Sequence, residues 1–589
     1  MLVTSNMETP WYRLYSVLLK FSVWFLLIVS ASISIITLLW FITFYDSGIE
    51  FSDEGKYLID IRYPLEYQYA VTNYGLVYHL AGKIVGFNLL NLRLLNLFLT
   101  VILASIATYV SINSNRSDSL WRKRETATVV FISSCVSLSF FGIVWILTPS
   151  YNSLTFQTLL LVWIGIVKVS TIDTNLMQKV YFIYLGFTLG ILFIAKPTSM
   201  LLLLSALCIY LIFTNLRNWL WVFLIPATSY ITISLFSIAK FGNPFEFFRD
   251  LYTGIQLALE LSVEYSFLKL LAYPLSIFTF AILIYIFRFK VIAILESEKR
   301  WVLIYLSISF ASITLGVVFF FYTGVNVLFA LLLTLLALYT VKTRWKKSTP
   351  RYFLFLSIFP FIAAFGSNNN LLVQSLMYFY FVLLFLILVA TNQDRIFASN
   401  HLLSWILLSS ILFSFLTVFW SSTHPYRQNQ SVTKMKSKID LDTPIKGVMV
   451  TKNVSEFLQN TNDLARKAGL SAGTPILDLT GQSSTLLFYL NAKILADSWL
   501  IGGYPGSDSV ALFKFKELSC SELRAAWLLI EPTGSRAIDF RRTLGSLGFS
   551  MNDYLGVASW QTPVGAGGEM EPRTQYLLKP KGVEGCSKF

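Results

Sequence analysis

The chain has 589 residues, of which 55% are hydrophobic and only 13% are charged. Charged residues make up about 25% of ordinary soluble proteins, so this composition excludes a soluble globular protein. The formal net charge is +14. In a soluble protein that charge would suggest nucleic-acid binding. In a membrane protein, basic residues collect in cytoplasmic loops, so we expect a lipid bilayer and no nucleic acid as partner.

Apolar stretches of about 20 residues are long enough to cross a bilayer as helices. About thirteen candidates follow one another along the chain. They are residues 21–44, 92–112, 127–147, 154–170, 180–195, 199–214, 219–239, 270–287, 301–321, 325–341, 352–366, 371–391 and 402–420. The first is too long for the apolar core of a signal peptide, so we expect it to be an uncleaved span.

One further segment, residues 73–87, is short and carries His79 and Lys83. Segments of this length are more often interfacial than spanning, so we place it on the membrane surface. Nearly every basic cluster then falls on the side of the N-terminus, as the positive-inside rule expects. We therefore predict a cytoplasmic N-terminus and outer interfacial helices at about 46–90 in a multi-pass protein of the inner (plasma) membrane.

The same topology makes residues 421–589 an extracytoplasmic domain that follows a membrane domain of residues 1–420. Its composition shifts to Gly, Ser, Asp and Lys. Residues 474–481 are typical of a buried strand that ends in a glycine turn, residues 484–490 of a helix, and residues 525–530 of another strand. We therefore predict an α-helical polytopic membrane protein with a C-terminal α/β domain.

Cysteines and histidines are few in this sequence. Cys135 and Cys208 lie inside apolar spans, where a packing role is expected. Only Cys520 and Cys586 are placed to pair with each other in an oxidising compartment. No Cys/His spacing resembles a zinc site. The loop 501–507 matches neither a Walker loop nor a dinucleotide fingerprint, so nucleotide binding is not expected there.

The unusual polar stretches of the membrane domain all fall on the predicted outer face. They are Asp53-Glu54, residues 92–96 with Arg93, residues 148–152 with Tyr151 and Asn152, residues 195–199 with Lys196, the loop 241–268, residues 321–324, and residues 366–370 with Asn368. Each stretch alone also fits an ordinary turn, loop or span end. Their gathering on one side indicates an active surface there.

Two adjacent carboxylates beside a span, Asp53 and Glu54, are the most informative of these features. A charge taken into hydrocarbon costs several kcal/mol, so their position needs a reason. Such a pair can accept a proton or hold a cation. Consecutive carboxylates do not easily flank a scissile bond as paired glycosidase carboxylates do. We therefore expect one carboxylate to act as a base on the acceptor and the other to orient a neighbouring group or a divalent ion.

Together these features resemble the glycosyltransferase C superfamily. They are the Asp-Glu pair after the first span, the interfacial helices behind it, the Arg93-Leu94 opening of the next span, an outer Lys196-Pro-Thr, and about thirteen spans. The nearest branch resembles glycosyltransferase family 39 and the bacterial aminoarabinose transferases, over residues 1–420. One departure is that residues 71–76 lack the Lys-Pro-Pro-Leu motif of many members.

The resemblance implies a glycosyltransferase that moves a hexose or pentose from a polyprenyl-phosphate carrier to a glycan, lipid or protein acceptor on the outer face. It implies catalytic roles for Asp53, as base, and for Glu54. Lys56, Arg93 and Lys196 would bind the phosphate of the carrier. His79, Tyr151, Asn152 and Asn368 would contact the substrates. Because phosphate is already a good leaving group, no strong general acid is needed. The sequence identifies no cofactor, and it leaves open whether a divalent cation is bound.

Two other functions fit parts of the sequence. An O-antigen polymerase or ligase would use arginines in large outer loops of the middle of the chain, whereas the acidic pair here comes early. A lipid-linked sugar flippase or transporter would place ionisable residues near span centres and show repeated halves. In this sequence the charges lie mainly at span ends, and no repeat is obvious. A non-enzymatic scaffold would leave the outer polar stretches unexplained.

Overall fold

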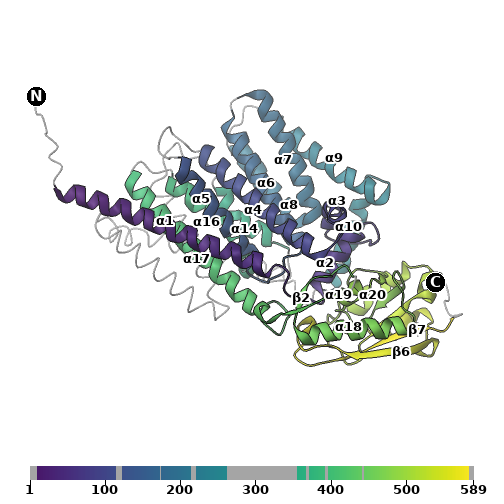
Figure 1. Ribbon diagram of the computed structural model, residues 1–589. Coiled ribbons are helices and arrows are strands. Elements are labelled where there is room, and N and C mark those ends of the chain that lie inside the picture. The colour runs from purple at the N-terminus through teal and green to yellow at the C-terminus, as the bar shows by residue number, and fades with distance from the viewer. Residues whose placement is uncertain are drawn as a thin grey trace, which may run out of the picture.

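The computed structural model describes residues 10–114, 123–172, 174–213, 220–261, 354–366, 371–391, 396–440 and 443–582. These residues form a bundle of long helices with a smaller α/β part at one end (Figure 1). The spans predicted at 270–287, 301–321 and 325–341 lie outside the described residues, as do residues 321–324 and Asn368.

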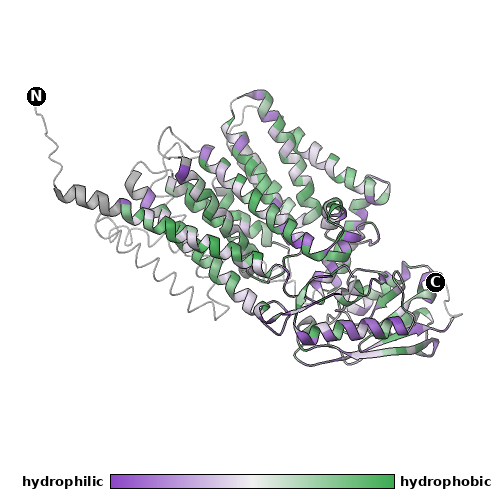
Figure 2. Cartoon of the chain, viewed as in Figure 1, coloured by the Kyte–Doolittle hydropathy of each residue, from purple (hydrophilic) through white to green (hydrophobic). Residues whose placement is uncertain are grey.

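Six helices in the described ranges are long and apolar enough to cross a membrane. They lie in α1 (Pro10–Phe44), α4 (Leu89–Ser114), α6 (Tyr151–Thr171), α7 (Asn175–Ala195), α9 (Trp221–Phe241) and α17 (Ile396–Thr423). Shorter apolar helices occur in α8 (Pro197–Phe213), α14 (Leu354–Ala364) and α16 (Phe379–Thr391). Figure 2 shows that hydrophobic residues dominate the bundle. A multi-pass membrane protein is therefore supported, while the count of thirteen spans stays a prediction.

Two predicted spans differ from the helices observed. The span predicted at 127–147 contains α5 (Lys123–Val136) and a 3-10 turn, Ser137–Phe140, after which the chain leaves the helix. Trp145 there adopts a left-handed φ of 48° and donates its indole N–H to the Ser47 carbonyl, at 3.3 Å. The span predicted at 371–391 is divided into α15 (Leu371–Leu376) and α16. Apolar composition alone does not locate such breaks.

Three short helices lie at the end of the bundle that carries the α/β part (Figure 1). They are α2 (Asp53–Arg62), α3 (Tyr74–Ile84) and α10 (Glu246–Leu261). Helix α3 has 11 residues. It is therefore about 16 Å long, roughly half of the hydrocarbon thickness of a bilayer. Helix α3 is therefore short for a span, and its location on the membrane surface stays a prediction.

The C-terminal part is built on a five-stranded sheet with the order β4-β3-β5-β7-β6. The strands are β3 (Pro475–Asp478), β4 (Lys493–Ile494), β5 (Trp527–Ile530), β6 (Tyr554–Gln561) and β7 (Thr574–Pro580). Strand β3 is parallel to β4 and β5, and β7 is antiparallel to β5 and β6. The prediction of a C-terminal α/β part is confirmed, although its boundary at residue 421 is untested.

Smaller elements surround this sheet. They are the antiparallel pair β1 (Ser437–Lys438) and β2 (Met449–Val450), and helices α18 (Lys452–Lys467), α19 (Ser484–Tyr489), α20 (Ser507–Lys516) and α21 (Cys520–Ala525). The strand predicted at 474–481, the helix at 484–490 and the strand at 525–530 correspond to β3, α19 and β5. Cys520 is disulfide-bonded, and its expected partner Cys586 lies outside the described residues. Cys135 and Cys208 are free thiols.

Helix α19 of the C-terminal part packs directly on α2 of the membrane part. The Thr485 backbone N–H donates to the Phe51 carbonyl at 3.1 Å, and its hydroxyl donates to the Glu50 carbonyl at 2.6 Å. A Cβ at Gly55 would lie 2.2 Å from the Thr485 nitrogen, so only glycine permits this approach. The C-terminal part is therefore fixed to the segment that carries the two adjacent carboxylates.

Candidate functional site

The Glu54 carboxylate is buried, with 1% of the residue exposed, and both of its oxygens accept hydrogen bonds from the protein. Arg93 donates to Oε1 through Nη2 at 2.7 Å and through Nε at 3.1 Å. The Thr148 hydroxyl donates to the same oxygen. The Glu50 backbone N–H donates to Oε2 at 3.0 Å. Glu54 is thus held by three segments of the protein.

Arg93, near the start of α4, is 2% exposed. Besides the Glu54 carboxylate, its guanidinium donates to the Tyr45 carbonyl at 3.0 Å and to the Gly48 carbonyl at 2.8 Å. These contacts join the end of α1, the start of α2 and α4. The structure brings Glu54 and Arg93 together, but it pairs them with each other. Most of the donor capacity of the guanidinium is used inside the protein.

Asp53 is the first residue of α2 and lies at the boundary with the C-terminal part. Its Oδ2 accepts a hydrogen bond from Arg427 Nη1 at 3.1 Å, and the two side chains keep exposures of 22% and 18%. Burial raises the pKa of Asp53, while the positive charges of Arg427, Arg536 and Lys56 act in the opposite direction. Asp53 is therefore a partly accessible carboxylate surrounded by cations.

Glu50 is a third carboxylate in this segment, and it was not among the residues predicted from the sequence. It is completely buried and accepts hydrogen bonds from the Ser52 N–H, at 2.9 Å, and the Ser52 hydroxyl, at 2.7 Å. Burial, helped by the negative charge of Asp53, raises the pKa of Glu50 to about 7. The sequence pattern that could have indicated Glu50 is the presence of three acidic residues within five positions, from Glu50 to Glu54.

Lys56 lies one turn into α2 and is also paired inside the protein. Its ammonium donates to Asp60 at 2.8 Å and to the Ser498 hydroxyl at 3.0 Å. Burial by itself would lower the pKa of Lys56, but Asp60 and Asp497 outweigh it, so the pKa lies above its usual value. Lys56 therefore connects α2 to the C-terminal part.

Three tyrosine rings gather beside the start of α2. The ring centroid of Tyr57 lies 5.9 Å from that of Tyr74 and 6.3 Å from that of Tyr151, and Tyr74 and Tyr151 are also 6.3 Å apart. Tyr57 follows Asp53 by four residues, so both side chains lie on one face of α2. Tyr151 opens α6, next to Asn152, whose Oδ1 accepts from the Tyr378 hydroxyl at 3.5 Å.

Lys196 lies at the junction between α7 and α8 and is 3% exposed. Its Nζ donates to the Ala363 carbonyl at 2.7 Å, and no carboxylate lies within ion-pair distance of it among the described residues. Burial lowers the pKa of Lys196 to about 7. The adjoining end of α7 contacts the start of α3, because the Ile194 carbonyl accepts from the Asn73 N–H at 2.8 Å.

His79 is held within the surface-helix region. Its Nδ1 lies 2.8 Å from the Ile61 carbonyl oxygen, and its ring packs on Phe87 with a centroid separation of 5.3 Å. Within the parts of the chain that the structure describes, no three His, Cys, Asp or Glu side chains converge as a metal site would require. A position for the divalent cation left open by the sequence is thus not identified there.

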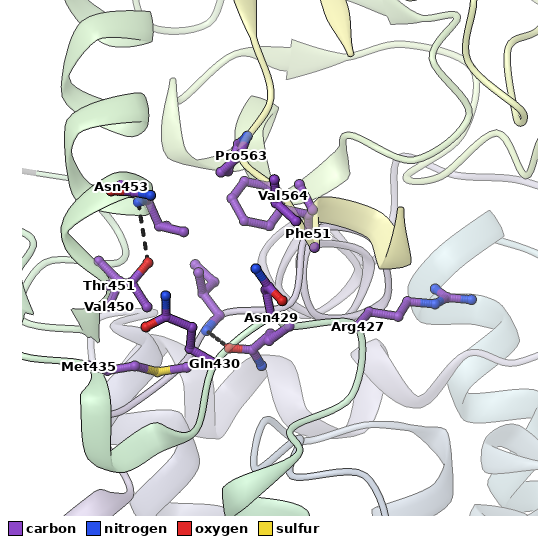
Figure 3. A pocket seen from close by; sticks show the side chains of 15 residues that line it. Phe51, Arg427, Asn429, Gln430, Met435, Val450, Thr451, Asn453, Pro563 and Val564 are labelled. Atoms are coloured by element: carbon purple, nitrogen blue, oxygen red, sulfur yellow. Dashed lines mark hydrogen bonds between the residues drawn. The ribbon is translucent and has the colours of Figure 1, made fainter. Parts of the chain in front are cut away.

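A pocket of about 120 Å³ lies where the segment before α2 meets the C-terminal part. Figure 3 shows its side chains: Phe51, Asn429, Gln430 and Asn453 border the space, and the Arg427 guanidinium points away from it. That guanidinium is the group bound to Asp53. No sequence motif indicated the pocket, because its lining comes from segments more than 400 residues apart in the chain, such as Phe51 and Asn453.

No protein-family model matches the chain, and no curated protein matches it. Among solved structures it is similar to ArnT from Cupriavidus metallidurans in the apo state, with 13% sequence identity and a TM-score of 0.41, covering 94% of this chain and 97% of that chain. It is also similar to ArnT from the same organism bound to undecaprenyl phosphate, with 11% identity, a TM-score of 0.40 and coverages of 93% and 97%.

Proposed function

We propose that this chain is a membrane glycosyltransferase that transfers a sugar from a polyprenyl-phosphate carrier to an acceptor on the outer face of the membrane. The observation that carries the proposal is the contrast between two adjacent carboxylates. Glu54 is buried and fully bonded, whereas Asp53 is partly accessible and faces Arg427 at 3.1 Å. Asp53 is the side chain of this pair that a substrate can reach.

Asp53 acts as the base that takes the proton from the acceptor hydroxyl. Burial raises the pKa of Asp53, which makes the carboxylate a stronger base than an ordinary aspartate. Arg427 and Arg536 counter this effect and favour the ionised form that a base requires. Glu54 contributes by holding the start of α2 in position through Arg93.

Lys196 binds the phosphate of the carrier. It is a buried cation without a carboxylate partner in the described structure, so an arriving phosphate would supply the missing counter-charge. Since phosphate leaves as an anion, a fixed cation stabilises the transition state as well as the bound donor. Arg93 and Lys56 already have acidic partners, so their role is to position α2 rather than to bind phosphate.

The donor sugar contacts Tyr151, the half-buried member of the tyrosine group, which packs against the buried rings of Tyr57 and Tyr74. Aromatic faces pack against the apolar face of a sugar ring, and this group begins one helical turn from Asp53. The expected outer location is supported by the disulfide at Cys520, because disulfides persist in oxidising compartments. The carrier class is that of the undecaprenyl phosphate bound in one of the two ArnT structures.

The test is Asp53→Asn in membranes supplied with labelled polyprenyl-phosphate sugars and a panel of acceptors. Removing the base should lower the transfer rate about 10²- to 10⁴-fold at equal expression. Glu456→Gln on α18, an exposed carboxylate paired with Lys452, is the matched control and should leave the rate unchanged. Unchanged transfer in Asp53→Asn would reject Asp53 as base. Movement of the lipid-linked sugar across the membrane without any glycosyl product would favour a flippase.

A further inference from the structure

We propose that the pocket between the segment before α2 and the C-terminal part binds a neutral sugar unit of the acceptor, so that the acceptor is a glycan. This inference rests on the function proposed above and names the substrate class of the same site. Its lining comes from Ile49 and Phe51, from residues 427–430, 435, 450, 451, 453 and 454, and from residues 563–566.

The polar lining of the pocket consists mainly of carboxamides. Gln428, Asn429 and Gln430 are consecutive, and Asn453 faces them from the start of α18 (Figure 3). Among the residues that the structure describes, the amides of Asn429, Gln430 and Asn453 form no hydrogen bond with another protein group. Gln428 uses its oxygen to accept from the Ile49 N–H at 3.0 Å. Donors and acceptors are therefore both available to a ligand.

This lining fits sugar hydroxyls better than charged groups. A hydroxyl both donates and accepts, and a carboxamide offers both partners at once. No carboxylate lines the pocket, and its one cationic side chain, Arg427, turns its guanidinium away toward Asp53. Phe51, Met435 and Val450 supply an apolar surface for the C–H face of a ring. The pocket is thus suited to a neutral polar ring and unsuited to phosphate.

The position of the pocket connects it to the base. Phe51 lines the pocket and precedes Asp53 by two residues, and Arg427 lines it with its stem while binding Asp53. None of the residues proposed for the donor, which are Lys196 and the tyrosine group, lines the pocket. Acceptor and donor would therefore reach Asp53 from different surfaces, as a transfer between two substrates requires.

Size and backbone pairing favour a single sugar ring over a peptide. A cavity of about 150 Å³ accommodates benzene, so this solvent-accessible pocket of about 120 Å³ suits part of one ring with the rest of a chain extending outward. Extended peptides are commonly bound by adding to an open strand edge. Strand β2, which supplies Val450, is paired with β1 on one side and bridges to Ser47 through Met449 on the other.

The experiment is saturation-transfer NMR on the full-length protein in nanodiscs, with the neutral trisaccharides maltotriose, cellotriose, mannotriose and tri-N-acetylchitotriose. A single bound ring predicts weak affinity, about millimolar. Val564→Trp would fill the pocket, and the exposed pair Asn429→Ala/Gln430→Ala would remove two of its four carboxamides. Each variant should weaken the affinity for the bound trisaccharide at least about tenfold. Leu555→Trp on β6, also an exposed apolar position, is the control.

Binding of one trisaccharide that is lost in both pocket variants and kept in Leu555→Trp supports the inference. No saturation transfer from any trisaccharide, or transfer unchanged in the pocket variants, overturns it. Binding of a Ser/Thr peptide instead, with loss in the same variants, also overturns it. Because this measurement needs no donor and no turnover, its failure is separate from a failure of Asp53→Asn to slow transfer, which would count against the proposed function alone.

Discussion

Two buried cations at the same end of the bundle have very different surroundings. Arg93 and Lys196 are 2% and 3% exposed. Arg93 is neutralised by Glu54 and donates to two further backbone carbonyls. Lys196 donates to the Ala363 carbonyl alone and has no carboxylate within reach in the described structure. Two cations that are equally buried thus differ in their partners: Arg93 has a carboxylate, and Lys196 has a neutral carbonyl.

The largest effect should follow from Arg93→Met. This change leaves the Glu54 carboxylate buried without its counter-ion, and breaking a buried pair in this way costs about 3–5 kcal/mol in the free energy of unfolding. Urea unfolding in detergent, followed by near-ultraviolet circular dichroism, measures it. Arg249→Met removes the exposed pair with Glu246 and should cost under about 1 kcal/mol. Equal losses of unfolding free energy in the two variants would show that the buried pair of Arg93 stabilises the protein no more than a surface pair does.

A smaller loss is expected for Gly55→Ala, which tests whether α2 is held by the C-terminal part. The new Cβ would lie 2.2 Å from the Thr485 nitrogen, and relieving such overpacking costs about 1–3 kcal/mol. Hydrogen exchange of α2 and α19 should accelerate. Gly556→Ala meets only an ordinary contact, at 3.8 Å from Leu578, and is the matched control. Unchanged exchange in Gly55→Ala would show that the two helices can separate without cost.

The smallest effect should come from Lys196 and should appear in donor binding rather than in stability. With a pKa of about 7, the ammonium is protonated below that pH and loses its charge above it. The donor KM should therefore rise between about pH 6 and pH 8, and Lys196→Met should raise it about tenfold at the lower pH. Lys196→Arg keeps the charge and should flatten the pH profile, because arginine does not deprotonate in this range.

The corresponding effect on folding has a definite sign. A lysine whose pKa is lowered on folding binds fewer protons in the folded state than in the unfolded state. Stability from Lys196 should therefore increase as the pH rises above about 7, while donor binding weakens. If unfolding free energy and donor affinity change in the same direction with pH in this range, Lys196 is not the phosphate ligand.

Several features of the molecule could be predicted from the sequence because they depend on local pattern. Long apolar runs indicated α1, α4, α6, α7, α9 and α17. The short segment at 73–87 was assigned to the surface by its length, and α3 has that length. Strands β3 and β5 and helix α19 followed from apolar runs and a glycine turn. Hydrophobic periodicity and segment length carry this information without reference to the rest of the chain.

The candidate site was only partly visible in this way. The sequence singled out the pair Asp53 and Glu54, but residue type alone does not distinguish the surroundings of the two carboxylates. Successive side chains on an α-helix point about 100° apart, so neighbouring carboxylates face different surroundings. Glu50 was missed because its burial comes from the C-terminal part, whose Thr485 hydroxyl donates to the Glu50 carbonyl.

Residue type and spacing alone indicate a multi-pass helical protein, a C-terminal α/β part and polar residues concentrated near span ends. Only the packed fold shows that Arg93 binds Glu54 and that Arg427, 374 positions farther along the chain, binds Asp53. It also left Lys196 without an anion in the described region and formed the carboxamide pocket. Contacts between residues so far apart in the chain depend on how the helices pack together, and no local sequence pattern encodes that packing.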